Sequence, residues 1–435
     1  MRPVPAFGFR LRRRLALAAL ALILAAGAIA PGSAQAKRIF VPRDHKRLQA
    51  AIDAASTGDT VWVAKGTYYG PFVIKKQLVL FGEDGPEETI LDGHDSVRVL
   101  HVEGVARGAI FGFRIQNGKA PGGGGIYCLR DTALVIGSCV IQSNFQAGVA
   151  AWQCGPLQIA NSQISGNKGS GLTASDSRVQ LFKVNFRDNQ SPTGGGVSLV
   201  STELIARDCL FEENRAGGGT GGGIYGESSP VRVMNFRFRG NSAAAGGGAV
   251  AVRDSGDLRI RNSFFAANHS STGGAILTDL SSLDVQSSIF TKNRSTAAGS
   301  AIQILGRRVA GVNPILSNNT FYRNGVDAEE GAALFVMEVA PEIIRNIFVV
   351  DSTSKNKAVL EMKGVPRYEC NLFYAMDGRG APPAATNTIV GNPSFCDAEN
   401  EDFHVHDLSP ALVALCGRLG ALGKGCSSFR ILPSQ

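Results

Sequence analysis

The hydrophobic pattern of the chain repeats along most of its length. Residues 134–324 hold eight runs that each end in an apolar residue, two further residues and an asparagine. Ten and eight residues before each asparagine the side chains are mostly apolar, such as Leu204 and Ala206 before Asn214, and the positions next to them are mainly polar. This period of two is typical of a half-buried β-strand and not of a helix. The asparagines are Asn144, Asn167, Asn189, Asn214, Asn241, Asn268, Asn293 and Asn324.

The repeat length indicates how these strands are connected. Successive asparagines are 22 to 31 residues apart, which is the length of one supersecondary unit stacked on its neighbours. Turn-forming residues recur six residues before the asparagine, and again thirteen or fourteen residues before it. The first set is Ser138, Asn161, Asp208, Asn235, Asn262 and Ser287, and the second set is Asp131, Asp176, Ser201, Ser228, Asp254 and Asp279. Each repeat therefore predicts three short strands with no room for a helix.

Such a unit buries its apolar face only by winding into a coil whose turns stack as parallel strands, about 4.8 Å apart. We expect the phenylalanines of one column to stack inside and the buried asparagines to form a hydrogen-bonded ladder. Parallel crossovers favour the right hand. The sequence therefore predicts an all-β, single-domain right-handed parallel β-helix with three short strands per coil.

The first 36 residues have the pattern of a secretory signal peptide. Five arginines and no acidic residue precede the apolar run Leu15–Ala30, and Ala34-Gln35-Ala36 is a small-residue cleavage motif. We expect export to the extracellular space, the cell surface or the periplasm, with no transmembrane span after cleavage. The five arginines are Arg2, Arg10, Arg12, Arg13 and Arg14.

The signal peptide also explains most of the positive charge. The formal net charge is +8, from 44 Lys and Arg against 36 Asp and Glu. Without these five arginines, 39 basic residues remain against 36 acidic ones. The charge therefore gives no reason to expect a nucleic-acid partner.

Two further segments are predicted at the ends of the coil. The coil occupies residues 37–380, and an amphipathic helix near 44–55, with Asp44 as its N-cap and Gly58 beyond its end, is expected to cover the first coil. Residues 381–435 are predicted to form a C-terminal cap segment. They are rich in turn residues and hold three of the eight cysteines.

Three segments of the sequence resemble a known family of proteins. The opening Leu48–Glu83, the Gly-Gly and Phe-x-x-Asn coils and the closing Asn392–Gly423 resemble exported bacterial right-handed β-helix repeat proteins of the pectin-lyase-like superfamily. The coils alone are also similar to the repeats of chlamydial polymorphic outer-membrane adhesins. The resemblance implies the fold, but this superfamily includes lyases, hydrolases, epimerases and non-catalytic adhesins.

No catalytic set stands out in the sequence. The motif Gly217-x-Gly219-x-x-Gly222 precedes a strand and recurs along the chain, so it indicates turns and close packing and not a dinucleotide site. His404 and His406 lack a third fixed ligand for zinc, and we expect no metal site and no cofactor. The Asn-Thr-Asp, Gly-His-Gly and Arg-Ile-Lys motifs of polygalacturonase-like hydrolases and the Arg-x-Pro-x-x-Arg motif of pectate lyases are missing.

A basic cluster is the strongest candidate site. Arg207, Arg232, Arg259 and Arg261 lie on outward positions of three consecutive coils. One interpretation is a solvated face relieved by Asp284 on the next coil. The other is a site for an anionic glycan, whose carboxylate or sulfate groups would accept hydrogen bonds from the guanidinium groups.

Six of the eight cysteines form two sets. Cys139 and Cys209 fall in one column but three coils apart, roughly 14 Å at the stacking distance, which is too far for a disulfide. Cys370, Cys396, Cys416 and Cys426 cluster near the C-terminus and are the disulfide candidates, with three pairings open.

The sequence predicts a monomeric, non-catalytic cell-surface or extracellular module that binds an acidic polysaccharide, a cell-surface glycan or another surface. The alternative is a polysaccharide lyase or glycoside hydrolase that acts on an acidic polysaccharide. Paired carboxylates beside the arginine face would favour the enzyme.

Overall fold

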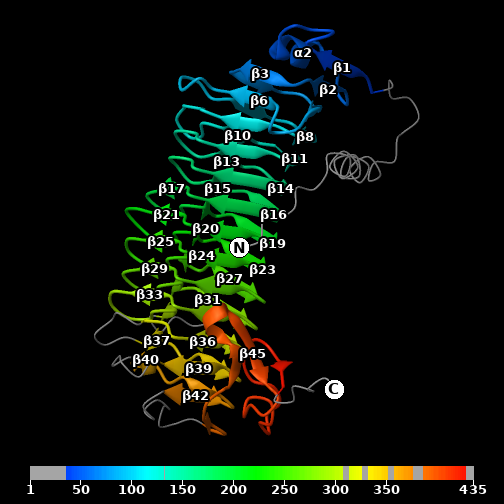
Figure 1. Ribbon diagram of the computed structural model, residues 1–435. Helices are drawn as coiled ribbons and strands as arrows, with labels where there is room; N and C mark the ends of the chain where they lie inside the picture. The colour runs from blue at the N-terminus through cyan, green and yellow to red at the C-terminus, as the bar shows by residue number, and fades with distance from the viewer. Residues whose placement is uncertain are drawn as a thin grey trace, which may run out of the picture.

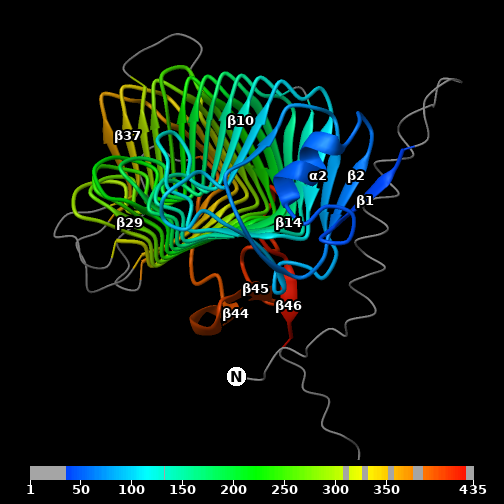
Figure 2. The same cartoon turned by 90° about the horizontal axis from the view of Figure 1, so that it is seen from above.

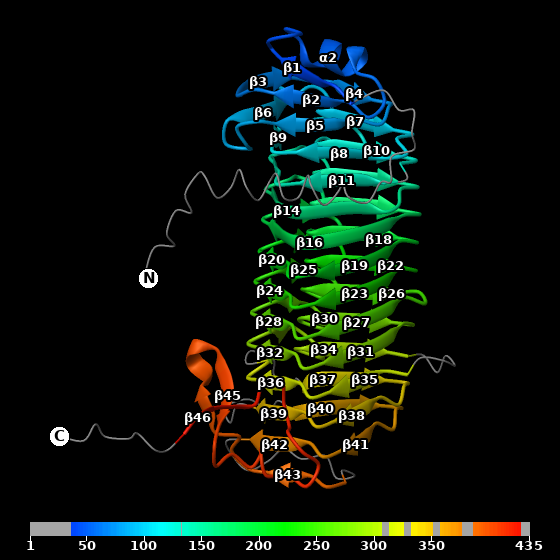
Figure 3. The ribbon, with the colours of Figure 1, turned by 90° about the vertical axis from the view of Figure 1, so that its right-hand side faces the viewer.

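The chain forms an elongated parallel β-helix, shown from two sides in Figure 1 and Figure 3. The computed structural model describes residues 36–131, 133–306, 313–325, 332–350, 357–375 and 386–427. The predicted signal peptide 1–36 lies, except for its last residue, outside these ranges. The predicted all-β fold with short strands in stacked coils is confirmed.

Sheet A, with 26 strands, forms two stacked columns on one long face of the coil. The strands β14 and β16 run through both columns. The first column consists of β1 (Arg38–Val41), β2 (Thr60–Val63), β5 (Val79–Gly82), β8 (Gly108–Phe111), β11 (Leu134–Gly137), β14 (Leu157–Ser165), β16 (Arg178–Arg187), β19 (Glu203–Arg207), β23 (Pro230–Met234), β27 (Asp257–Arg261), β31 (Ser282–Gln286), β35 (Ile315–Ser317), β38 (Glu342–Ile344) and β41 (Arg367–Glu369). The second column adds β3 (Gly66–Tyr69), β6 (Thr89–Asp92), β9 (Arg114–Gln116), β12 (Val140–Gln142), β20 (Leu210–Glu212), β24 (Arg237–Arg239), β28 (Phe264–Ala266), β32 (Ile289–Thr291), β36 (Thr320–Tyr322), β39 (Ile347–Val350), β42 (Leu372–Ala375) and β43 (Ile389–Val390).

Two further sheets complete the cross-section, which Figure 2 shows from above. Sheet B has 12 strands, at most one from each coil. They are β4 (Phe72–Ile74), β7 (Leu100–Glu103), β10 (Ile126–Leu129), β13 (Val149–Trp152), β15 (Leu172–Ser175), β18 (Val197–Val200), β22 (Ile224–Glu227), β26 (Val250–Arg253), β30 (Ile276–Asp279), β34 (Ile302–Leu305), β37 (Ala332–Met337) and β40 (Lys357–Met362). Sheet C adds a fourth, two-residue strand to five coils in the glycine-rich region. Its strands are β17 (Gln190–Ser191), β21 (Arg215–Ala216), β25 (Ser242–Ala243), β29 (His269–Ser270) and β33 (Arg294–Ser295).

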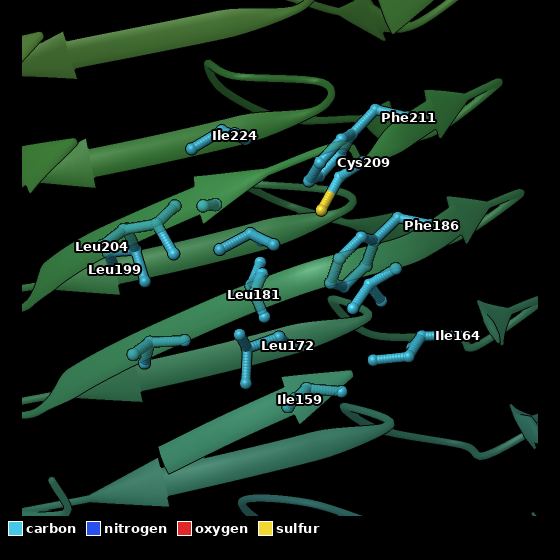
Figure 4. Close-up of a cluster of buried hydrophobic side chains, with 14 of the residues drawn as sticks. Ile159, Ile164, Leu172, Leu181, Phe186, Leu199, Leu204, Cys209, Phe211 and Ile224 are labelled. Atoms are coloured by element: carbon cyan, nitrogen blue, oxygen red, sulfur yellow. The ribbon is translucent and has the colours of Figure 1, made fainter. Parts of the chain in front are cut away.

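A column of phenylalanine rings fills the core, as the sequence predicts. Phe186, Phe211, Phe238, Phe265, Phe290, Phe321, Phe348 and Phe373 are at most 1% exposed. Neighbouring rings along this column are stacked, with centroids 4.6 to 5.1 Å apart. Figure 4 shows the beginning of the column, where Phe186 and Phe211 lie beside Cys209.

The predicted asparagine ladder is also present. From Asn144 to Asn324, each side-chain amide donates to the Oδ1 atom of the next asparagine at 2.8 to 3.0 Å. The backbone N–H of each asparagine except the last donates to the same oxygen. These hydrogen bonds satisfy side chains that would otherwise be costly to bury. A second, shorter ladder joins Asn319, Asn346 and Asn371.

The first set of predicted turns is correct, and the second set is correct in part. All six residues of the first set have φ between 49° and 59°, in the left-handed region that Asn and Asp tolerate best. In the second set Asp131 and Asp279 are instead buried, and the left-handed residues there are Arg130 and Leu280. A third left-handed position, which was not predicted from the sequence, lies directly before the ladder asparagine, as at Glu213.

The capping helix is α2 (Leu48–Ala54), whose Leu48, Ala51 and Ile52 pack into the core. The prediction of Asp44 as its N-cap is wrong. The N-cap is Arg47, which makes no side-chain capping hydrogen bond. Asp44 instead accepts from the backbone N–H of Phe40, four residues earlier.

The C-terminal segment folds back against the side of the coil, over the second column of sheet A (Figure 3). It contains β44 (Phe395–Asp397), a 3₁₀ turn at Ala398–Asn400, β45 (Asp402–His406) and β46 (Lys424–Cys426). Phe403 packs on Tyr322, and Glu401 pairs with Arg239, 162 residues earlier in the chain. We call residues 394–427 the C-terminal strap.

The cysteine predictions agree with the structure. The four C-terminal cysteines pair as Cys370–Cys416 and Cys396–Cys426. The first disulfide ties the strap to the coil, and the second lies within the strap. Cys139 and Cys209 are free and buried.

Candidate functional site

The predicted arginine cluster lies on the outer face of sheet A. Arg232 and Arg259 are direct neighbours on β23 and β27, as the repeat register predicts. Arg207 and Arg261 lie in the adjacent outward column, on either side of Met234. The four side chains therefore share one face.

Three of the four arginines have carboxylate partners. Arg232 lies 2.6 Å from Glu203, Arg259 lies 2.9 Å from Asp257, and Arg261 pairs with Asp284. Because these acids relieve the repulsion between neighbouring guanidinium groups, the solvated-face interpretation is sufficient to explain the cluster in the unbound protein. Of these three ion pairs, the sequence predicted only the one that involves Asp284.

The fourth arginine, Arg207, lies in a column with aromatic residues that were not predicted from the sequence. The guanidinium carbon of Arg207 lies 4.7 Å from the centroid of the Phe182 ring, in a cation–π contact. Phe182 precedes Arg207 in the same outward column. Followed toward the N-terminus, this column holds Ala160 and Gly137 and then four aromatic residues, Phe111, Phe81, Trp62 and Phe40.

We call these residues the aromatic–arginine strip: Phe40, Trp62, Phe81, Phe111, Phe182, Arg207, Arg232, Arg259 and Arg261. Its N-terminal rings contact one another, with centroids 4.5 Å apart for Trp62 and Phe81 and 6.2 Å apart for Phe40 and Trp62. Phe81 and Phe111 are nearly buried, whereas Phe40, Trp62 and Phe182 are partly exposed. Extending the alternation of inward and outward residues upstream of residue 134 would have revealed the first four of these rings, and Phe182 already occupies an outward position of the repeat.

Sheet B carries a second polar cluster, centred on Glu103. Arg130, Lys75 and His101 lie 2.8, 3.5 and 3.9 Å from its carboxylate. Burial and the nearby Arg98 guanidinium lower the pKa of His101, and the Arg130 hydrogen bond lowers the pKa of Glu103. Because Glu103 already occupies the point on which Arg130 and Lys75 converge, the cluster is an ionic crosslink between coils.

The remaining polar residues singled out in the sequence do not form a site. His404 contacts Asp402 at 2.7 Å and His406 contacts Asp407 at 2.9 Å, so each histidine pairs with its own acid. Among the described residues no group of three or more His, Cys, Asp or Glu side chains is arranged to hold a metal ion.

One carboxyl group has a strongly shifted pKa. Burial raises the pKa of Asp131 to about 6, although its Oδ1 atom accepts a hydrogen bond from the backbone N–H of Val105 at 2.8 Å. Asp131 is only 1% exposed. It lies under the turn between sheets B and A and cannot contact a substrate there.

Comparison with known proteins supports the fold. The family model described as "right handed beta helix region" matches residues 98–265. No curated protein matches the sequence. In the part of the chain that the structure describes, no helix is long and apolar enough to cross a membrane.

Several solved structures are similar to this chain. A PL6 family alginate lyase shares 12% identity, with a TM-score of 0.53, over 88% of this chain and 56% of its own. The pectate lyase Pel9A shares 12% identity over 68% of this chain and 79% of its own, with a TM-score of 0.36. The Streptococcus pneumoniae surface protein and adhesin PfbA shares 12% identity over 85% of this chain and 99% of its own, with a TM-score of 0.40. At these identities the similarity concerns the fold alone.

Proposed function

We propose that this right-handed parallel β-helix protein is an exported, non-catalytic module that binds a linear acidic polysaccharide along the aromatic–arginine strip. The observation that carries the proposal is the register of the strip. One outward column holds five aromatic rings, with Gly137 and Ala160 between Phe111 and Phe182, and then Arg207 and Arg261; Arg232 and Arg259 lie in the column beside it. Three of the rings, Phe40, Trp62 and Phe182, are partly exposed. Aromatic faces pack against sugar rings, and guanidinium groups bind carboxylate or sulfate groups.

The arginines retain capacity for a ligand despite their partners. The side chains of Arg232 and Arg259 are 40% and 53% exposed. Exposed ion pairs contribute only about 0–1 kcal/mol, and a guanidinium has five N–H donors. Arg259 uses its Nε atom toward Asp257, which leaves its two terminal nitrogens for a ligand.

The strip also has a shape that suits a chain. Its positions recur at the stacking distance of about 4.8 Å, so a linear polymer parallel to the coil axis meets several rings and guanidinium groups in succession. Many weak contacts then add up to useful affinity. Because much of the attraction is between exposed charges, binding weakens as salt increases.

Export agrees with the two disulfides, which persist in oxidising compartments. The alternative, a polysaccharide lyase or glycoside hydrolase, requires paired carboxyl groups or a calcium cluster with a basic group beside the bound chain. The acids next to the strip, Glu203, Asp257 and Asp284, each pair with an arginine. Incubation with polygalacturonate or a sulfated glycan separates the two functions, because an enzyme shortens the polymer and a binding module leaves its length unchanged.

The test is retention on an immobilised acidic polysaccharide at low salt. We expect the wild type to be retained and to elute as salt increases, and the double variant Arg232→Glu, Arg259→Glu to lose retention with unchanged circular dichroism. The double variant Lys357→Glu, Lys363→Glu changes the net charge equally at and just beyond β40 of sheet B, and it should still be retained. Equal retention of the two double variants, or no retention of the wild type, would contradict the proposal.

A further inference from the structure

Sheet C gives the coil an additional outer surface, which runs along the left edge of Figure 1. In each of its two-residue strands the first side chain points outward. The second points inward and is mostly buried. The outward column reads Gln190, Arg215, Ser242, His269 and Arg294. It contains no acidic residue, whereas three of the four arginines in the cluster on sheet A pair with acids.

A concavity of about 240 Å³ lies along this surface. Its lining includes the outward side chains of Arg215, Ser242 and His269 from three consecutive coils. The residues two positions further on in the same coils, Gly217, Ala244 and Ser271, also contribute. We call this concavity the sheet C pocket.

The pocket is hollow because two of these positions carry little or no side chain. A Cβ atom added at Gly217 would meet no other atom within 4 Å, so a side chain at this position would extend into open space. Gly217 has no positive φ that would exclude other residues. By contrast, a Cβ atom at Gly222 in the same coil would collide with the backbone. The pocket therefore follows from the choice of small residues, and a substitution at Gly217 can fill it.

Arg215 faces this pocket with its charge uncompensated. It is exposed, and among the described residues it has no carboxylate partner within ion-pair distance. The acidic residue nearest to Arg215 along the sequence is Glu213, and its carboxylate lies 3.9 Å from the guanidinium of Arg187. His269 is also exposed and has no side-chain partner in the described part of the chain. A guanidinium with all its donors free is suited to bidentate binding of an oxyanion.

We propose that the sheet C pocket binds one anionic sugar residue that bears a carboxylate or a sulfate ester. The guanidinium of Arg215 binds the oxyanion, and the imidazole of His269 and the hydroxyl of Ser242 bind ring hydroxyls. The three coils span about 10 Å along the axis, which is longer than an isolated oxyanion and suits a sugar ring with its substituent. The volume is below the roughly 300–1,000 Å³ of pockets for drug-sized ligands, which suits contact with about one sugar residue.

This site is separate from the aromatic–arginine strip, because the strip lies on sheet A and the pocket lies on sheet C. It therefore does not depend on the proposed function. A monosaccharide is too short to use the contacts along the strip, whereas it can fill the pocket. Monosaccharide binding and polymer retention consequently report on different surfaces.

The experiment is a ligand-observed NMR titration of the protein at low salt with galacturonate and with galactose 6-sulfate, each compared with galactose. We expect a dissociation constant in the millimolar range for at least one anionic sugar, and at least tenfold weaker binding of galactose. Arg215→Gln should weaken the binding of the anionic sugar about tenfold or more. Gly217→Glu should abolish it, because it places a carboxylate in the pocket beside Arg215.

The control is Arg107→Gln, which removes an exposed arginine far from sheet C and should leave the affinity unchanged. A preference for only one of the two anionic sugars identifies the ligand as a uronate or a sulfated sugar. Equal binding of galactose and the anionic sugars would overturn the proposal, and so would unchanged affinity in Arg215→Gln or no binding of either anionic sugar. Loss of polymer retention in the strip variant with intact monosaccharide binding would separate the two sites.

Discussion

At the scale of single residues, the coil is stabilised by side chains that contact equivalent residues in the coils on either side. Phe238 is fully buried and stacks on Phe211 and Phe265, with centroids 5.1 and 4.8 Å away. Asn241 accepts and donates hydrogen bonds in the ladder just beyond it. A substitution in the middle of either column therefore disrupts contacts with two neighbouring coils at once.

The substitution Phe238→Ala should lower the free energy of unfolding by about 3–5 kcal/mol, because it removes ring contacts with Phe211, Phe236 and Phe265 and leaves a cavity. Denaturant unfolding of variant and wild type measures the difference. A difference below about 1 kcal/mol would show that the phenylalanine column contributes little to the core.

Asp131 should make stability depend on pH. An ordinary Asp carboxyl has a pKa near 4, and burial in the fold raises the pKa of Asp131 to about 6. The folded state therefore binds this proton more tightly than the unfolded state. The stabilising contribution of the protonated form is complete below about pH 4 and is lost as pH rises to about 6.

The substitution Asp131→Asn removes this ionisation but keeps an oxygen for the N–H of Val105. The free energy of unfolding of this variant, relative to that of the wild type, should rise between about pH 4 and 6 by up to about 3 kcal/mol. Thermal or denaturant unfolding at several pH values tests this, with the same substitution at the exposed turn residue Asp176 as the control. A stability difference that does not change with pH would rule out the expected effect of burial.

At the scale of elements, the strands of the coils and most of their turns could be predicted from the sequence. Each depends on a pattern that repeats every 22 to 31 residues. The place of the C-terminal strap could not be predicted, because its contacts join unrepeated residues far apart in the chain, such as Glu401 and Arg239. The predicted start of the helix was wrong because Asp44 fits a capping pattern, whereas its carboxylate accepts a hydrogen bond from the backbone N–H of Phe40 in the preceding strand.

Reduction of the two disulfides should loosen the strap before the coil. Their closed loops span 46 and 30 residues, and each disulfide contributes roughly 2–4 kcal/mol. Hydrogen exchange measured by mass spectrometry should show faster exchange in residues 394–427 after reduction, with protection of the Phe238 region retained. Unchanged exchange in the strap, or equal loss of protection in strap and coil, would contradict this order.

At the scale of the whole molecule, the coil presents separate outer faces with different chemistry. Sheet A carries the aromatic–arginine strip, sheet B an ionic crosslink at Glu103, and sheet C the pocket beside Arg215. The arginines of the strip could be predicted from the repeat register. Two of their acidic partners could not, because Arg232 and Arg259 reach Glu203 and Asp257 through side-chain conformations that the register does not determine.

The most direct test of polysaccharide binding along the strip uses one of the two tryptophans, Trp62, as a probe. Trp152 lies on sheet B, so Trp152→Phe leaves Trp62 in the strip as the single fluorescent indole. Titration of this variant with polygalacturonate at low salt should give a saturable change in tryptophan fluorescence, which high salt reverses and neutral galactan does not produce. Retention of this variant on the acidic polysaccharide without any change in Trp62 fluorescence would contradict binding along the strip.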